Sequence, residues 1–417
     1  MKKWWQNIWI KIIFFFSVVG PGIISANADN DAGGITTYSV VGAHYGTKLL
    51  WVLLLTTIAL AVTQEMGVRI GLVTRKGLGA VIRENFGVPW TAFAILTMLV
   101  ANFGTVTAEF AGIASAFYII GVSKYIAVPL AAALIWFILF KGSFKTTQKI
   151  FLIFSAFYIV YIVNGLIVGA DFGGAMRAMV SPTLELTTPF LITMIALIGT
   201  TITPWGQFFI QSYVVDKGLD ARHYHAEKAE VYLGALITNV VSFFIIISTA
   251  ATLYKYGIDI KDAGDAALAL KPLAGNLAQF LFAFGLFAAS TLGAFILPTT
   301  TAYACCEAFG WEAGFDTTWK EAKTFYSLIL AGIVIPALFV LIPNVSLVNI
   351  MIWSQDLNGI LLPFILIFIM FIVNNRKIMG EHVNKPIGNI ITFLTIFGII
   401  LASVVLLITS FAAPTAA

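Results

Sequence analysis

Five acidic residues lie inside long apolar stretches of the sequence: Asp29, Asp31, Glu65, Glu109 and Asp356. A charged side chain is costly in such surroundings, so the residues that remain there usually bind a cation, move a proton or pair with a base. They are therefore the first candidates for chemistry, and the elements that hold them follow from the rest of the sequence.

Asp31 belongs to a polar string that contains glycine, NADNDAGG at 27–34. Where a helix is interrupted, backbone carbonyls lose their partners, and a carboxylate beside freed carbonyls makes an oxygen-rich cation site. The alternative is that Asp31 only caps the helix that follows. For Asp29, capping and a place in an aqueous vestibule are equally compatible with the sequence.

A second interrupting string, GTTITPWGQ, occupies 199–207. Thr200 and Thr203 are one helical turn apart, and Pro204 removes a backbone donor, which helps to free carbonyls. Either the threonine hydroxyls or their carbonyls could face an ion, unless the hydroxyls bond back to their own helix. A third polar cluster contains Gln355 and Asp356.

Other polar residues favour structural interpretations. Glu65 precedes Arg69 by four residues, which predicts an ion pair along one helix near the membrane interface. His223 and His225 resemble a metal pair, but they lie in a loop of mixed charge, which disfavours ligation. The adjacent cysteines at 305–306 cannot close a useful loop and are expected to pack inertly.

The composition excludes a soluble protein. Of the 417 residues, 59% are apolar and 11% charged, whereas soluble domains contain about 45–50% apolar and about 25% charged residues. A membrane-crossing helix needs about 20 apolar residues. That criterion predicts an all-α polytopic membrane protein forming a single transport domain over 1–417. Its eleven spans are expected near 8–42, 47–73, 90–120, 124–141, 146–169, 187–215, 228–255, 275–306, 324–342, 345–374 and 387–412.

Basic residues set the expected orientation, because cytoplasmic loops are enriched in lysine and arginine. With the N-terminus inside, the outer loops hold six of the 24 basic residues and the inner side holds the remaining 18. The six are Lys48, Lys124, Arg177, Lys255, Lys261 and Lys271. We expect a cytoplasmic N-terminus, an extracellular C-terminus and a first span that is retained and not cleaved as a signal peptide.

The two interrupting strings fall in spans one and six, five spans apart. Because five is odd, the second block of spans starts with inverted topology. Paired broken helices in inverted repeats are typical of transporters with a site at the bilayer midplane. We therefore expect repeat one at about 8–169 and repeat two at about 187–374, with helices 1 and 6 broken. An extra helix follows at about 387–412.

Several motifs resemble the Nramp divalent-metal transporters. They are GPG at 20–22, DAGG at 31–34, QEMGVRIGLVT at 64–74, AE at 108–109, SQ at 354–355, LPF at 362–364 and RKIMGE at 376–381. This resemblance implies a LeuT-type fold with a metal site between spans one and six. Nramp proteins typically bind the ion with an Asp, an Asn, the Met of a Met-Pro-His sequence and a backbone carbonyl.

The departures from that pattern change the expected ion. Gly34 stands in place of the Asn, Thr203 and Trp205 replace the Met and the His, and Val106 replaces an acidic residue of the family's proton route. Losing the thioether removes a soft ligand, and a wider all-oxygen pocket suits Mg²⁺, which keeps several waters. The pattern resembles the magnesium-transporting branch of the family.

These patterns predict uptake of Mg²⁺, and also of Mn²⁺, by alternating access without obligatory proton coupling. The expected metal site comprises Asp31, Ala28, Gly34, Thr200, Thr203 and Gln355. We expect no cofactor and no nucleic-acid partner, and a monomer in a prokaryotic plasma membrane. One alternative is proton-coupled import of Mn²⁺ or Fe²⁺. Another is an amino-acid or amine symporter of the same fold, although Asp31 would repel a substrate carboxylate. An enzyme and an ATP-driven pump have no supporting motif.

Overall fold

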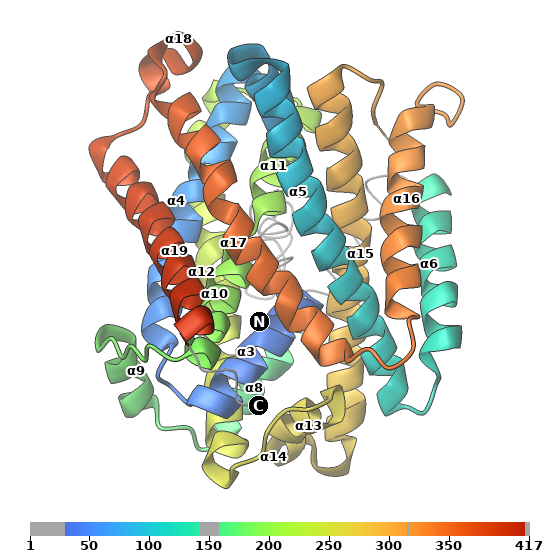
Figure 1. Cartoon of the computed structure of the whole chain (residues 1–417), viewed down its shortest axis with the longest axis vertical. Coiled ribbons are helices and arrows are strands. Elements are labelled where there is room, and N and C mark those ends of the chain that lie inside the picture. The colour runs from blue at the N-terminus through green and yellow to red at the C-terminus, as the bar shows by residue number, and fades with distance from the viewer. Residues whose placement is uncertain (1–29, 142–157, 315–316, 413–417) are drawn as a thin grey trace, which may run out of the picture.

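The computed structural model describes residues 30–141, 158–314 and 317–412, and every longer regular element in these ranges is an α-helix. Figure 1 shows the helices gathered into one bundle, with α6 and α16 side by side at one edge. The helices are α3 (Ala32–Tyr45), α4 (Leu50–Thr74), α5 (Leu78–Ile119), α6 (Lys124–Lys141), α8 (Ile159–Ile167), α9 (Phe172–Val180), α10 (Thr188–Thr201), α11 (Pro204–Asp216), α12 (Tyr224–Thr252), α13 (Ala263–Ala267), α14 (Lys271–Ala274), α15 (Ala278–Phe309), α16 (Lys323–Val340), α17 (Leu347–Asn374), α18 (Arg376–Met379) and α19 (Pro386–Ala412).

The predicted spans correspond well to these helices. Eight segments of the described chain are long and apolar enough to cross a membrane, with α10 and α11 counted as one. The shorter α6 coincides with the fourth predicted span, while α3 and α8 cover the later parts of the first and fifth spans. The earlier parts of those two spans lie outside the described residues. The sequence-based assignment of an all-helical polytopic protein is therefore confirmed.

The break in span six is present but shorter than predicted. Only Ile202 and Thr203 leave the helical conformation, with extended backbone angles, so the rest of the string at 199–207 is helical. The cause is local, because Thr203 caps α11 and Pro204 supplies the first turn, where its missing N–H costs nothing. The last three residues of the first polar string, 32–34, are also helical, because α3 begins at Ala32 directly after Asp31.

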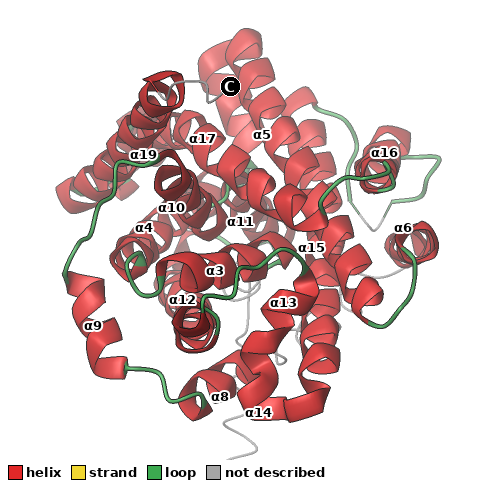
Figure 2. Ribbon diagram, turned by 60° about the horizontal axis from the view of Figure 1, so that its bottom comes forward, coloured by secondary structure: helices red, strands yellow, loops and turns green. Residues whose placement is uncertain are grey.

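Small residues allow the helices to meet closely around the two breaks. Figure 2 shows α3, α10 and α11 inside a ring that includes α4, α5, α12, α15 and α17. A side chain at Gly199 of α10 would collide with the backbone of α17 at Gln355 and Gly359. Gly112 of α5 similarly faces Ala32 at the start of α3. These glycines permit backbone contact, which positions polar groups of four helices near one another.

Candidate metal site

Asp31 lies at the first turn of α3 and is only 2% exposed. Its Oδ1 accepts a hydrogen bond from the backbone N–H of Gly34 at 2.6 Å, which is the geometry of an N-cap. Asp31 therefore caps α3, as the alternative interpretation predicted, and Gly34 donates the N–H of this capping bond. A carboxylate has two oxygens and about four acceptor positions, so one capping bond leaves acceptor capacity for a cation.

Glu109 of α5 reaches the same helix start. Its Oε2 accepts from the backbone N–H of Ala32 at 3.3 Å, and its other oxygen, Oε1, is buried without a hydrogen-bond partner among the described residues. Glu109 is fully buried, and Gly293 of α15 provides the space for it. Glu109 therefore contacts the residue that directly follows Asp31.

Thr200 has two oxygens without local partners. In a continuous helix its carbonyl would accept from the N–H of residue 204, but Pro204 has none. Its hydroxyl is buried and has no hydrogen-bond partner in the part of the chain that the structure describes. By contrast, the hydroxyl of neighbouring Thr201 bonds back to Leu197 O at 2.8 Å. Unpaired buried oxygens are rare, so Thr200 is well suited to face a cation or its waters.

Thr203 and Trp205 form the start of α11. The hydroxyl of Thr203 accepts from the backbone N–H of Gly206 at 3.2 Å, so the expected alternative to ion binding, a bond to its own helix, is present. Trp205 is 1% exposed, and its indole N–H has no partner among the described residues.

Gln355 of α17 connects the two broken helices. Its side chain lies against Gly33 of α3, and its backbone carbonyl lies against Gly199 of α10. The amide oxygen accepts from Asn358 Nδ2 at 2.9 Å, and that amide also donates to Thr105 of α5 at 3.0 Å. This network fixes Gln355 beside the residues that adjoin Asp31 and Thr200.

The structure thus brings three of the predicted residues, Asp31, Thr200 and Gln355, to the meeting point of α3, α10 and α17. Tyr38 of α3 also contacts Thr201 of α10, with 3.2 Å between their hydroxyl oxygens. Ala28 and Asp29 lie outside the described residues. Among the residues described, no group of three or more His, Cys, Asp or Glu side chains could hold a metal ion. The candidate site is therefore built from one or two carboxylates and neutral oxygens.

Asn30 fixes the start of α3 to its neighbours, and the sequence analysis did not single it out. Its side-chain amide donates to Thr238 Oγ1 at 2.7 Å and its amide oxygen accepts from Ser242 Oγ at 3.0 Å, both on α12. Tyr158 donates its hydroxyl to Asn30 O at 2.8 Å. These bonds hold the residue before Asp31 in place. The sequence does contain an indication of this contact, since Thr238 and Ser242 are four residues apart and therefore lie on one face of an apolar span.

Glu65 and His223, by contrast, make structural contacts. Arg69 Nε lies 3.1 Å from Glu65 Oε1, which confirms the ion pair, but both side chains are less than a tenth exposed. The pair is therefore buried, and Tyr224 of α12 covers it and donates to Glu65. His223 Nδ1 contacts Asp220 at 3.1 Å in a capping arrangement. The adjacent cysteines are buried and free.

Comparisons with known proteins decide the family. The profile described as natural resistance-associated macrophage protein-like (Nramp) matches residues 22–409. The chain belongs to the Nramp family. This Nramp chain is 26% identical over 398 residues to a divalent metal cation transporter MntH of Pectobacterium carotovorum, with 91% of this chain and 92% of the relative covered. MntH of Yersinia pestis is 23% identical over 406 residues, with coverage of 94% and 95%.

Solved structures agree with the fold of this Nramp chain. An Eremococcus coleocola manganese transporter superimposes with a TM-score of 0.78 at 15% identity, covering 97% of this chain and 90% of that one. MhsT in complex with L-phenylalanine gives a TM-score of 0.59 at 16% identity, covering 94% and 98%. The fold is therefore the LeuT type predicted from the two breaks, in a multi-pass membrane protein.

Proposed function

We propose that this chain is a secondary transporter that carries Mg²⁺, and also Mn²⁺, by alternating access without obligatory proton coupling. We place it as a monomer in a prokaryotic plasma membrane, with the N-terminus in the cytoplasm and the C-terminus outside. The observation that carries the proposal is the donor set at the two breaks. It consists of the Asp31 carboxylate, the freed oxygens of Thr200 and the amide of Gln355, all hard oxygen ligands.

The residue types at the second break favour a hard, hydrated ion. Mg²⁺ dehydrates reluctantly and is usually held through one or two carboxylates with several waters retained. Thr203 has a hydroxyl where the Nramp pattern has the thioether of a Met. Gly34 has no side chain where that pattern has the amide of an Asn. Relatives named as divalent metal cation transporters support a doubly charged cation as the substrate, and an oxygen-only donor set favours Mg²⁺ among such ions.

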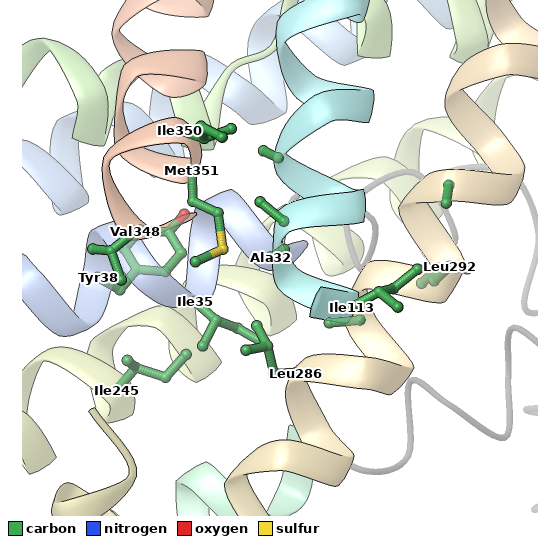
Figure 3. Packing of buried hydrophobic residues seen from close by; sticks show 14 of the residues in the cluster. Ala32, Ile35, Tyr38, Ile113, Ile245, Leu286, Leu292, Val348, Ile350 and Met351 are labelled. Atoms are coloured by element: carbon green, nitrogen blue, oxygen red, sulfur yellow. The ribbon is translucent and has the colours of Figure 1, made fainter. Parts of the chain in front are cut away.

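One thioether does approach α3, but it is already engaged. The sulfur of Met351 accepts the hydroxyl of Thr36 at 3.3 Å. Figure 3 shows Met351 lying over α3 among Ile35, Tyr38 and other apolar side chains. Because Thr36 is five residues beyond Asp31, this sulfur belongs to the helix packing. It does not restore the soft ligand that Thr203 lacks.

The surroundings of Glu109 argue against a continuing proton route. One turn earlier on α5 stands Val106, which is 2% exposed, and a further turn back Asn102 donates to Thr301 at 2.7 Å. Neither side chain titrates, so a proton leaving Glu109 has no carrier along this face of the described helix. Influx needs no proton, since a divalent cation gains roughly 4.6 kcal/mol at about 100 mV.

A proton-coupled importer of Mn²⁺ or Fe²⁺ is the second candidate, and one observation favours it. Glu109 places a second buried carboxyl group beside the start of α3, next to Asp31, and paired carboxyl groups are suited to exchanging a proton for a cation. The solved manganese transporter of the same fold is in keeping with this candidate. The amino-acid symporter is less well supported, because the buried Asp31 carboxylate would repel that of a substrate.

The test is uptake by proteoliposomes that contain the purified full chain and a Mg²⁺-sensitive dye, with an inside-negative potential set by valinomycin. We expect Mg²⁺ uptake well above that of empty liposomes, and at most a twofold inhibition by equimolar Cd²⁺, because the oxygen ligands give the soft ion no advantage. Failure to accumulate Mg²⁺, or at least tenfold inhibition by equimolar Cd²⁺, would contradict the assignment in favour of the second candidate.

A further inference from the structure

A groove of about 480 Å³ lies between α4, α12 and the extra helix α19, away from the candidate metal site. Its apolar wall includes Ile58, Val62, Leu236, Ile387 and Ile391. Of these, Ile58 is 44% exposed, Leu236 55% and Ile387 72%. On a helix bundle in a membrane, exposed apolar side chains of spanning helices face lipid, so the groove opens toward the acyl chains of the bilayer.

One end of the groove is polar, and its buried charges are mutually satisfied. Arg69 pairs with Glu65, donates to Asn384 Oδ1 at 2.7 Å and donates to the backbone oxygen of His382 at 2.9 Å. Tyr224 completes the acceptor side by donating to Glu65. These contacts pair the charge of Arg69 with that of Glu65 and engage its terminal nitrogens with groups of the protein.

Two lysines at the same end are not paired in this way. Lys228 of α12 and Lys385, just before α19, both line the groove, and neither contacts a carboxylate in the described ranges. Lys228 lies over the rings of Tyr224 and Tyr232, with its Nζ 5.9 and 5.5 Å from their centroids. The aromatic faces hold the ammonium group beside the groove. The polar end thus has an excess positive charge next to an apolar slot.

We propose that this groove binds one anionic phospholipid, with its phosphate between Lys228 and Lys385 and an acyl chain along Leu236 and Ile391. The residues at the polar end come from the end of α4, the start of α12 and the segment before α19, so they lie at the same membrane face. Basic pockets between spanning helices recognise anionic headgroups in this way. A zwitterionic lipid would offer the lysines no net charge.

Such a lipid would connect α19 to the transport helices. Groove-lining residues belong to α4 of the first predicted repeat, α12 of the second and α19 outside both. Where the lipid bridges Lys228 and Lys385, it supplements the contacts that Arg69 already makes with the segment before α19. The inference concerns lipid alone and does not depend on which metal ion is transported.

The experiment measures lipid binding to the delipidated full chain by native mass spectrometry. Phosphatidylglycerol and phosphatidylcholine with identical acyl chains are titrated separately. We expect phosphatidylglycerol to half-saturate the protein at a concentration at least tenfold lower. In Lys228→Gln/Lys385→Gln, the half-saturating concentration of phosphatidylglycerol should rise roughly 10- to 30-fold, from the loss of two phosphate contacts. If that variant does not fold, Lys385→Gln alone, at an exposed position, should give a rise of roughly 3- to 10-fold.

The matched control is Lys320→Gln/Lys323→Gln, which removes the same charge from exposed lysines at the start of α16, and Figure 1 shows that start at the same end of the bundle. This control should bind phosphatidylglycerol as the wild type does. Equal binding of the two lipids, or equal losses in the groove variants and the control, would overturn the proposal. Displacement of the lipid by millimolar glycerol 3-phosphate would also overturn it, because the site would then recognise a free phosphate.

Discussion

Replacing Asp31 with alanine is expected to reduce Mg²⁺ uptake at least about 100-fold, to the level of empty liposomes. The carboxylate is the only charged group of the predicted metal-binding set, and losing it removes at least about 2.7 kcal/mol of interaction with a divalent ion. The measurement is initial uptake rate in proteoliposomes at matched protein density.

The variant also loses a helix cap, so a control must separate capping from ion binding. Asp171→Ala serves this purpose, since Asp171 caps α9 by the same contact, accepting from Gly174 N–H at 2.8 Å. Each substitution should lower the stability of the fold by about 1 kcal/mol, but only Asp31→Ala should abolish uptake. Normal Mg²⁺ uptake by Asp31→Ala would refute the site assignment.

Replacing Thr203 with methionine is expected to shift the ion preference from Mg²⁺ toward Cd²⁺. A thioether at the start of α11 would place a soft ligand at the second break, and soft ligands favour Cd²⁺ and late transition metals. We expect Cd²⁺ uptake relative to Mg²⁺ uptake to increase at least about tenfold, which corresponds to about 1.4 kcal/mol. Competition between the two ions in the same vesicles measures this ratio directly.

Thr203→Leu is the matched control, because leucine resembles methionine in size and equally removes the cap on Gly206. Both variants should lose about 1 kcal/mol of stability. Only the sulfur-containing variant should gain Cd²⁺ uptake. If the leucine variant gains as much, the change reflects the lost hydroxyl and Thr203 does not occupy a ligand position.

The described spans and the break in span six could be predicted from sequence because their causes are local. Runs of apolar residues define membrane helices, and Pro204 marks the second break wherever the helix lies. The limits of the break could not be predicted as well. The capping bond of Thr203 confines it to two residues, and that bond depends on backbone geometry that composition does not reveal.

The site was only partly predictable because its members come from distant segments. Asp31 was identified from its place in a break, but its contact with Glu109 spans 78 residues of sequence and depends on the packing of α3 against α5. The tether of Asn30 to α12 and the groove beneath α19 are likewise products of tertiary packing. Spacing within a helix predicts neighbours three or four residues apart and gives no information about such pairs.

The most direct test of the central claim records Mg²⁺ and pH together inside wild-type proteoliposomes held at an inside-negative potential. A Mg²⁺ dye and a pH dye are enclosed in the same vesicles, and Mg²⁺ is then added outside. We predict that Mg²⁺ accumulates while the internal pH stays at the level of vesicles without protein. Internal acidification that follows added Mg²⁺ would contradict uncoupled transport, and the absence of any Mg²⁺ signal would contradict the proposed substrate.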